Sequence, residues 1–313
     1  MGVGNLATVG CRSDWFGGLQ VQTTTVVTLP NGIATLTASA STAVGAVRQV
    51  NEDSFVAESP LFVVADGMGG HERGDRASQT VIRVLTDRLP EGSIPTPADV
   101  LSAITAANEG VRQLTADDGH RLVSGTTLVG VALAQANNGA TTHWMVFNVG
   151  DSRIYSWDGR LLEQLSVDHS AVQELVDAGA ITHAAARVHP ERNIITRAVG
   201  AEDLVDADVW LLPVAGAQSF VICSDGLTKE LDDDDIAGLL ASHGGAVPAD
   251  PDAAGQPVSI ADALVAAANR AGGKDNITVI VLESSIGGAS LDDERTQERT
   301  FLAEHLEQTR PRA

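Results

Sequence analysis

Four aspartates lie where apolar stretches meet glycine or asparagine: Asp66, Asp151, Asp225 and Asp275. The neighbouring stretches are rich in β-branched residues, which indicates buried strands that end or begin at these acids. Asp-Gly is also the commonest turn signal, so Asp66 alone predicts a metal site only weakly. Four such acids in a strand-rich chain suggest that the strand ends converge. Clustered carboxylates repel one another unless cations neutralise them.

The stretch 63–70 shows the pattern most clearly, because two valines lead into Asp66 and three glycines follow within four positions. Glycine lets the backbone approach a ligand and leaves the Gly67 carbonyl free as a second oxygen ligand. Mg²⁺ and Mn²⁺ prefer such oxygens. Two ions about 3.5–4 Å apart activate water and clamp the oxygens of a phosphoryl group. Arg48 is then the candidate for holding the phosphate through paired hydrogen bonds.

Composition and charge restrict the partners and the cellular location that the chain can have. The 313 residues carry 20 Lys+Arg against 41 Asp+Glu, a formal net charge of −21. This charge argues against nucleic acid or an anionic membrane as a non-specific partner. Two distant cysteines, Cys11 and Cys223, make no disulfide framework, and Cys223 lies in an apolar run typical of a buried thiol. With no membrane-length apolar run and no signal-peptide pattern, a soluble cytoplasmic protein is expected.

The remaining pattern predicts strands alternating with amphipathic helices. Two strands joined by a turn at 30–32 are expected within 19–46, and later strands at 124–134, 142–149, 154–157, 161–165, 206–212, 219–223 and 277–282. Helical spacing of apolar residues predicts helices within 73–89, 97–116, 232–242 and 258–271. Residues 47–57 form a charged segment just before the Asp66 strand, and 166–200 form an excursion from the sheet with three histidines.

Seven stretches in order resemble one known family. They are Arg48 with Asn51-Glu52-Asp53, Asp66-Gly67-Met68-Gly69-Gly70, Ser124-Gly125-Thr126-Thr127, Asn148 with Gly150-Asp151-Ser152-Arg153, Ser224-Asp225-Gly226-Leu227, Gly273-Lys274-Asp275-Asn276-Ile277-Thr278, and His189-Pro190 with Asn193 to Ala198. Over roughly residues 40–283 the chain is similar to metal-dependent serine/threonine protein phosphatases of the type 2C (PPM) family in their bacterial form.

This resemblance implies an α+β fold, a four-layer α-β-β-α sandwich. Two antiparallel sheets would pack face to face, with helices on their outer sides. A small flap segment would project from this sandwich. The domain boundaries follow from it: an irregular N-terminus at 1–18, a phosphatase catalytic domain at 19–284 with its flap at about 166–200, and a charged C-terminal tail at 285–313.

The resemblance also assigns catalytic metal ligands by position. Asp66 would bridge two Mn²⁺ or Mg²⁺ ions, and the Gly67 carbonyl would complete one of them. Asp225 and Asp275 would hold the other ion. All three aspartates would be catalytic, through attack on the phosphate by a water that bridges the ions.

Four further residues receive roles from the same resemblance. Glu52 and Asp53 would act through metal-bound waters. Asp151 is similar to the ligand of a third, weaker metal near the flap. Arg48 would grip the substrate phosphate and completes the catalytic set.

One position departs from the pattern of some family members, which have a histidine after the Asp-Gly pair. Met68 stands there, as is usual in bacterial members, and a thioether cannot donate a proton. The general acid must then be a metal-bound water or another group. His71 lies three residues further on, but the favoured interpretation is an exposed turn histidine.

Other polar residues have structural interpretations. Ser124–Thr127 is expected to serve packing near the site, and Arg153 to pair with a nearby acid. His169, His183 and His189 lack a metal-binding spacing and are expected to be surface or satisfied histidines. Asp232–Asp235 precedes apolar residues at helical spacing, so it is expected to form the acidic first turn of a helix.

The favoured function is a protein phosphatase for phosphoserine and phosphothreonine, acting without a covalent intermediate. A catalytically silent module that binds phosphoproteins is the alternative, although the metal carboxylates and Arg48 are all present. An acidic β-sandwich binding Ca²⁺ does not fit the ordered motifs. The family resemblance points to a Ser/Thr protein kinase and its substrates as partners of a monomeric enzyme, with a stress or sporulation regulator as the runner-up. Oxygen-only sites leave Mn²⁺ and Mg²⁺ equally open.

Overall fold

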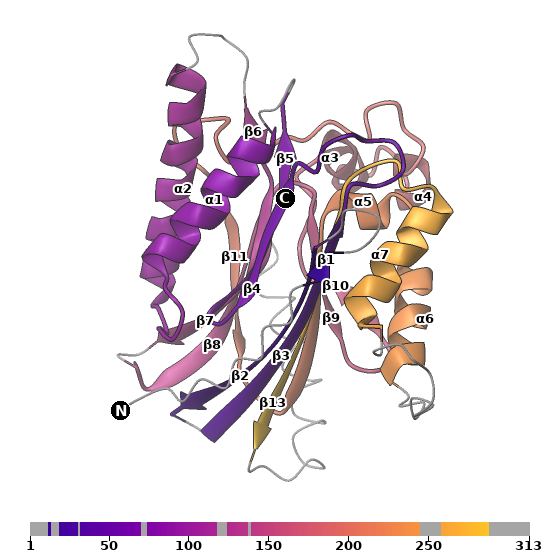
Figure 1. The fold of residues 1–313 in the computed structure, drawn as a ribbon. Helices are drawn as coiled ribbons and strands as arrows, with labels where there is room; N and C mark the ends of the chain where they lie inside the picture. Colours follow the sequence, from indigo (N-terminus) through magenta and orange to yellow (C-terminus); the bar gives the residue numbers. More distant parts are fainter. Residues whose placement is uncertain are drawn as a thin grey trace.

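The structure is a computed structural model that describes residues 12–13, 19–30, 32–69, 74–117, 124–136, 139–244 and 258–287. Two antiparallel sheets pack face to face, and helices cover the outer side of each (Figure 1). This arrangement confirms the predicted α+β sandwich.

The first sheet has seven strands in the order β1-β2-β3-β13-β12-β9-β10, all paired antiparallel. Its strands are β1 (Arg12–Ser13), β2 (Leu19–Leu29), β3 (Gly32–Ala43), β9 (Arg153–Trp157), β10 (Leu162–Gln164), β12 (Ala217–Cys223) and β13 (Ile277–Gly287). The second sheet runs β11-β8-β7-β5-β4, with β6 paired to β5. Its strands are β4 (Asp53–Glu58), β5 (Leu61–Met68), β6 (Gly125–Thr126), β7 (Leu128–Ala136), β8 (Thr141–Val149) and β11 (Asp208–Pro213).

The helices form the two outer layers. Helices α1 (Gly74–Arg88) and α2 (Pro97–Asp117) cover the second sheet, while α6 (Asp233–Gly244) and α7 (Ile260–Ala271) cover the first (Figure 1). A one-turn helix, α5 (Asp225–Thr228), follows β12 directly. Helices α3 (Ala171–Asp177) and α4 (His183–Ala186) lie between β10 and β11, in the segment predicted to leave the sheet.

The central core lies between the sheets, where inward-facing residues of both are buried. Trp144 of β8 joins them, because its ring contacts Phe62 on one side and Phe220 on the other, with centroids 6.3 and 5.7 Å away. Edge-to-face geometry of this kind adds about 0.5–1.5 kcal/mol per pair beyond area burial. Trp144 is thus one of the large side chains that pack the two sheets together.

The predicted strands and helices recur at the expected places, but three expectations need correction. Residues 53–58 of the charged segment form β4, because Phe55 and Val56 pack on the core clusters while Asp53 faces the site. Asp66 does not end its strand, since β5 continues to Met68. Within the expected irregular N-terminus, Arg12–Ser13 pairs with β2, while His71 and the tail beyond 287 lie outside the described residues.

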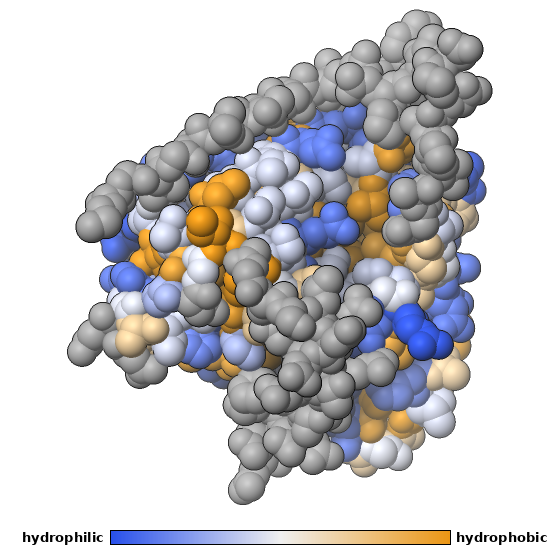
Figure 2. Space-filling model, turned by 90° about the horizontal axis from the view of Figure 1, so that it is seen from below, coloured by the Kyte–Doolittle hydropathy of each residue, from blue (hydrophilic) through white to orange (hydrophobic). Residues whose placement is uncertain are grey.

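The acidic strand ends face the upper end of the molecule in Figure 1. The lower end carries the β2–β3 turn and shows exposed apolar residues among hydrophilic ones (Figure 2). Cys223 is fully buried in the first sheet's outer core, as its apolar run predicted. Among the described helices, none combines the length and the apolar character that crossing a membrane requires.

Candidate metal centre

The backbone of Asp66 is held in place by the Ser124–Thr127 segment. Its amide donates to Thr127 Oγ1 at 3.0 Å, and its carbonyl accepts from Thr126 Oγ1 and from the Thr127 amide, both at 2.9 Å. These hydroxyls are buried and committed to the backbone of β5. The segment therefore has the structural role that its sequence predicted.

Gly67 lies where two chain segments cross. A Cβ on it would lie 2.1 Å from the Gly74 carbonyl oxygen and 2.5 Å from that of Glu52. The Gly67 amide donates to the Glu52 carbonyl at 3.2 Å. Only glycine allows this approach, which brings Glu52 beside Asp66.

Asp53 joins the two sheets. It stands opposite Asp66 in the β4–β5 register, so two carboxylates share one edge of the second sheet. Its Oδ2 accepts hydrogen bonds from Ser224 Oγ at 2.8 Å and Thr278 Oγ1 at 2.7 Å, both from the first sheet's side. Its buried Oδ1 has no hydrogen-bond partner among the described residues.

Asp225 begins helix α5 rather than occupying a turn. Gly226 permits this, because a Cβ there would lie 1.9 Å from the Asn276 carbonyl oxygen. Asp225 Oδ2 forms an ion pair with Lys229, four residues further along. Its Oδ1 is buried and has no hydrogen-bond partner in the described part of the chain.

Asp275 and Arg48 meet at the solvent side of this group. Arg48 Nη2 lies 2.8 Å from Asp275 Oδ1, and Lys229 Nζ lies 2.9 Å from Asp275 Oδ2. Next to them, Asn276 donates to the carbonyls of Val44 and Val50 and accepts from the Glu52 amide, each at 2.9 Å. The Asn276 side chain thereby holds together the loop at 44–52, which carries Arg48.

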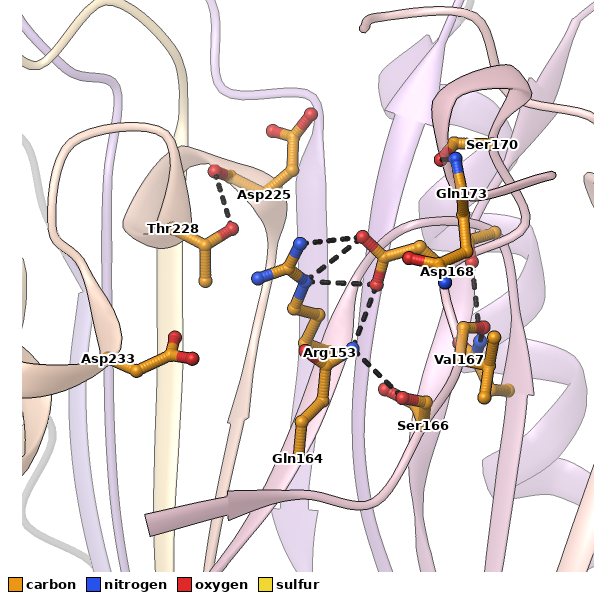
Figure 3. A network of polar contacts seen from close by, with 12 residues as sticks. Arg153, Gln164, Ser166, Val167, Asp168, Ser170, Gln173, Asp225, Thr228 and Asp233 are labelled. Carbon is orange, nitrogen blue, oxygen red and sulfur yellow. Dashed lines mark hydrogen bonds and ion pairs between the residues drawn. The ribbon is translucent and has the colours of Figure 1, made fainter. Parts of the chain in front are cut away.

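Asp151 follows β8 at the base of the flap segment. Its Oδ1 is buried with no hydrogen-bond partner in the described ranges. Nearby, Arg153 donates hydrogen bonds to the Asp168 carboxylate (Figure 3). Its Nε lies 2.9 Å from Oδ1 and 3.1 Å from Oδ2, and its Nη2 lies 2.7 Å from Oδ2. In that view Arg153 lies between α5 and the Asp168 segment, with its guanidinium turned toward Asp168. Arg153 is thus the structural ion-pair partner that the sequence predicted.

His169 is a satisfied buried histidine, as expected. Its Nδ1 accepts from the Gly150 amide at 3.1 Å, and its Nε2 lies 3.2 Å from Asp208 Oδ2. Arg197 Nη1 reaches Asp208 Oδ1 at 2.9 Å. On the flap segment, His183 is exposed and His189 is half-buried. The start of the flap segment is thus joined to Gly150, next to Asp151, and both of its ends are joined to Asp208 of β11.

Burial raises the pKa of most of these acids. It raises the pKa of Asp53 and of Asp151 to about 7, with Asp225 adding to the effect in both cases. The pKa of Asp66 lies well above its ordinary value, because of burial first and then the charges of Asp53 and Asp225. Burial also raises the pKa of Asp225 and of Glu52.

Asp275 is the exception within the group. Burial favours a higher pKa for its carboxyl, but the Lys229 charge and hydrogen bond, followed by the Arg48 charge, bring that pKa below the ordinary value. The group thus contains several carboxylates that resist ionisation and one that is held ionised by two cations.

These shifts predict how the stability of the metal-free protein depends on pH. Above pH about 4 the unfolded chain has released the protons of Asp53 and Asp151, whereas the folded chain holds them until pH about 7. Bound protons therefore stabilise the fold below pH 7, and this contribution is lost as pH rises through 7. The free energy of unfolding in EDTA should fall by about 1–3 kcal/mol between pH 6 and pH 8.

Urea unfolding at pH 6, 7 and 8 measures this change. Saturating Mn²⁺ should reduce the loss, because bound cations stabilise the ionised carboxylates. Equal unfolding midpoints in EDTA at all three pH values would contradict the assigned shifts.

Two observations show that the residues fit divalent cations. All the donors are oxygens, which suit Mg²⁺ and Mn²⁺. Buried oxygens of Asp53, Asp151 and Asp225 have no hydrogen-bond partner in the described residues. Within the same residues no three His, Cys, Asp or Glu side chains close around one point.

Several site residues were not singled out from the sequence. Lys229 contacts two of the acids, and its i+4 spacing from Asp225 was the available signal. Asp168 and Asn276 gave no such signal, because their partners are distant in sequence. The acidic run was interpreted correctly, since α6 begins at Asp233 and Asp232 and Asp235 each accept the other's amide.

Comparisons with known proteins agree with this geometry. Residues 45–247 match the family model described as Protein phosphatase 2C. The chain is 34% identical over 253 residues to the serine/threonine phosphatase stp of Listeria monocytogenes, covering 77% of this chain and 93% of that one.

Two solved structures are similar along most of the chain. The PPM Ser-Thr phosphatase MsPP from Mycobacterium smegmatis, in complex with cacodylate, superposes with a TM-score of 0.65 at 36% identity, covering 80% of this chain and 98% of that one. The catalytic domain of PstP in complex with two manganese ions gives 0.64 at 30%, covering 80% and 99%.

Proposed function

Because the chain belongs to the protein phosphatase 2C family, we propose that its buried acidic group is the metal centre of its phosphatase reaction. Members of this family are metal-dependent, and the chain is a serine/threonine protein phosphatase. The observation that carries the assignment to this group is the set of buried carboxylate oxygens without hydrogen-bond partners in the described residues. When bound, two divalent ions supply an activated water and neutralise charge on the phosphoryl oxygens.

The proposed ligands follow from their positions. Asp66 lies among Asp53, Asp225 and Asp151, so its carboxylate is central enough to bridge two ions. The Gly67 carbonyl is next to it on β5. Asp225 and Asp275 share the Lys229 contact and form the ligand pair of the second ion.

Three acids at the edge of the group have lesser proposed roles. Glu52 and Asp53 orient waters, an assignment supported for Asp53 by its two hydroxyl donors and its free Oδ1. Asp151 holds a third, weaker ion. Its place beside the flap segment and its unpartnered Oδ1 among the described residues support that assignment.

Arg48 is proposed to hold the substrate phosphate. Its side chain is 47% exposed, and its pairing with Asp275 is on the solvent side of the acids. An exposed ion pair is weak, so the guanidinium is free to exchange Asp275 for a dianionic phosphate. Arginine suits this role because its planar fork forms two parallel hydrogen bonds.

The leaving alkoxide needs a proton source. Met68 has no proton to donate, and its side chain lies 3.7 Å from the position a Cβ would take on Gly125. His71 lies outside the described residues. We therefore propose that water protonates the leaving group, which is one of the two options that Met68 leaves open.

The substrates are phosphorylated proteins. We propose that a Ser/Thr protein kinase and its substrates are among them, and that the enzyme acts as a monomer in the cytoplasm. Mn²⁺ is the first metal to try, because a similar catalytic domain has been solved with two manganese ions. Mg²⁺ and a stress or sporulation regulator are the alternatives for metal and target.

The test is phosphate release from a phosphothreonine peptide and from an autophosphorylated Ser/Thr kinase domain, in Mn²⁺, Mg²⁺ or EDTA. Turnover in metal that stops in EDTA is the expected result. Binding of Mn²⁺ and phosphopeptide without release would instead support the silent binding module. Release from the peptide but not from the kinase domain would refute the proposed kinase target alone.

A further inference from the structure

Lys229 lies inside the acidic group rather than beside it. Its Nζ contacts Asp225 Oδ2 and lies 2.9 Å from Asp275 Oδ2. The two acids come from different segments, α5 and the loop before β13, so the ammonium links them across space. The side chain is only 35% exposed, which places the charge partly out of water.

The charge of Lys229 acts on four acids of the group. For Asp225 and Asp275 it is the largest influence that favours the ionised form, and it also acts on Asp66 and Asp151. The carboxylates in turn raise the pKa of Lys229 despite its burial, so the ammonium stays charged.

The neighbouring arginines do not duplicate this role. Arg153 is engaged by Asp168 through three hydrogen bonds. Arg48 meets Asp275 from the solvent side and is about half exposed. Lys229 is the cation that the described residues place on Asp225.

We propose that Lys229 is a built-in counter-ion that competes with the divalent metal for Asp225 and Asp275. In the metal-free protein its ammonium holds both carboxylates in position and offsets their repulsion. An incoming ion needs the negative charge of the same two carboxylates, so it competes with the ammonium for them. The inference rests on the proposed metal ligands, and it makes Lys229 a positioning residue that sets the metal concentration at which the site fills.

The test compares Lys229→Gln with Lys274→Gln by calorimetric titration of Mn²⁺. Lys274 is a matched control, because it removes the same charge nearby but pairs with Glu230 at 3.4 Å and is 74% exposed. Lys229→Gln should bind Mn²⁺ about three- to tenfold more tightly than wild type. Lys274→Gln should stay within about twofold, and Lys229→Arg, which keeps the charge, should remain near wild type.

Thermal melting provides a second measurement. Here Lys229→Gln should weaken the metal-free protein, although it strengthens Mn²⁺ binding. In EDTA, Lys229→Gln should melt below wild type, because the acids lose their counter-ion. The rise in melting temperature caused by Mn²⁺ should then be larger in this variant. Unchanged or weaker Mn²⁺ binding by Lys229→Gln would overturn the inference. Failure of wild type and variant alike to bind Mn²⁺ would overturn the proposed metal centre as well.

Discussion

An Asp225→Asn variant is expected to lose metal-dependent phosphate release by about 10³-fold in kcat/KM. The substitution keeps the shape of the side chain but removes its negative charge. Asp225 contributes a buried oxygen without a hydrogen-bond partner in the described residues, and its charge acts on Asp53, Asp66 and Asp151. Charge-neutral replacement of such a ligand weakens both the metal site and the electrostatic stabilisation that the metal provides.

The matched control is Asp234→Asn, an exposed acid in the first turn of α6 that changes net charge equally. It should retain wild-type turnover. Calorimetry with Mn²⁺ should show weaker binding for Asp225→Asn only. Full activity of Asp225→Asn at saturating Mn²⁺ would remove Asp225 from the metal centre.

A Gly226→Ala variant is expected to be destabilised by about 3 kcal/mol or more. The added methyl would lie 1.9 Å from the Asn276 carbonyl oxygen, which is backbone and cannot rotate away. Helix α5 would have to separate from the segment before β13, and Asp225 and Asp275 belong to those two segments. Stability and metal binding should therefore fall together, as measured by urea unfolding and Mn²⁺ titration.

Gly238→Ala provides a control with the opposite sign. Gly238 lies in α6, and an added Cβ would meet nothing within 4 Å. Alanine favours helix over glycine, so this variant should gain up to about 1 kcal/mol. A Gly226→Ala protein as stable as wild type would mean that α5 and Asn276 are less closely packed than the structure describes.

The runs of β-branched residues predicted most of the strands, whereas the sandwich itself was implied by the family resemblance. β3 and β13 pair over eleven residues, and each had been recognised from β-branched runs. The acids were found for a related reason. Asp66, Asp151, Asp225 and Asp275 interrupt apolar runs, and an interrupted run is visible without knowledge of the fold.

Other features depend on contacts that no local pattern records. β4 was missed because Asn51 and Glu52, just before it, and Asp53, its first residue, gave this stretch the appearance of a charged segment. Asp53 is accommodated there by Ser224 and Thr278, which are more than 170 positions away. Lys229 was passed over for the same reason, since its second partner, Asp275, is brought to it only by the packing of β12 on β13.

Asn276 and Arg48 differ in what the fold requires of them. Asn276 closes the loop at 44–52 with three hydrogen bonds, whether or not a phosphate is ever cleaved. Arg48, by contrast, makes one half-exposed ion pair that the packing can spare. A related protein that has lost catalysis but keeps this fold would therefore retain asparagine at position 276, whereas position 48 would be free to change. Under the proposed role of Arg48, the residues at positions 48 and 276 of a related sequence should together distinguish active phosphatases from catalytically inactive members.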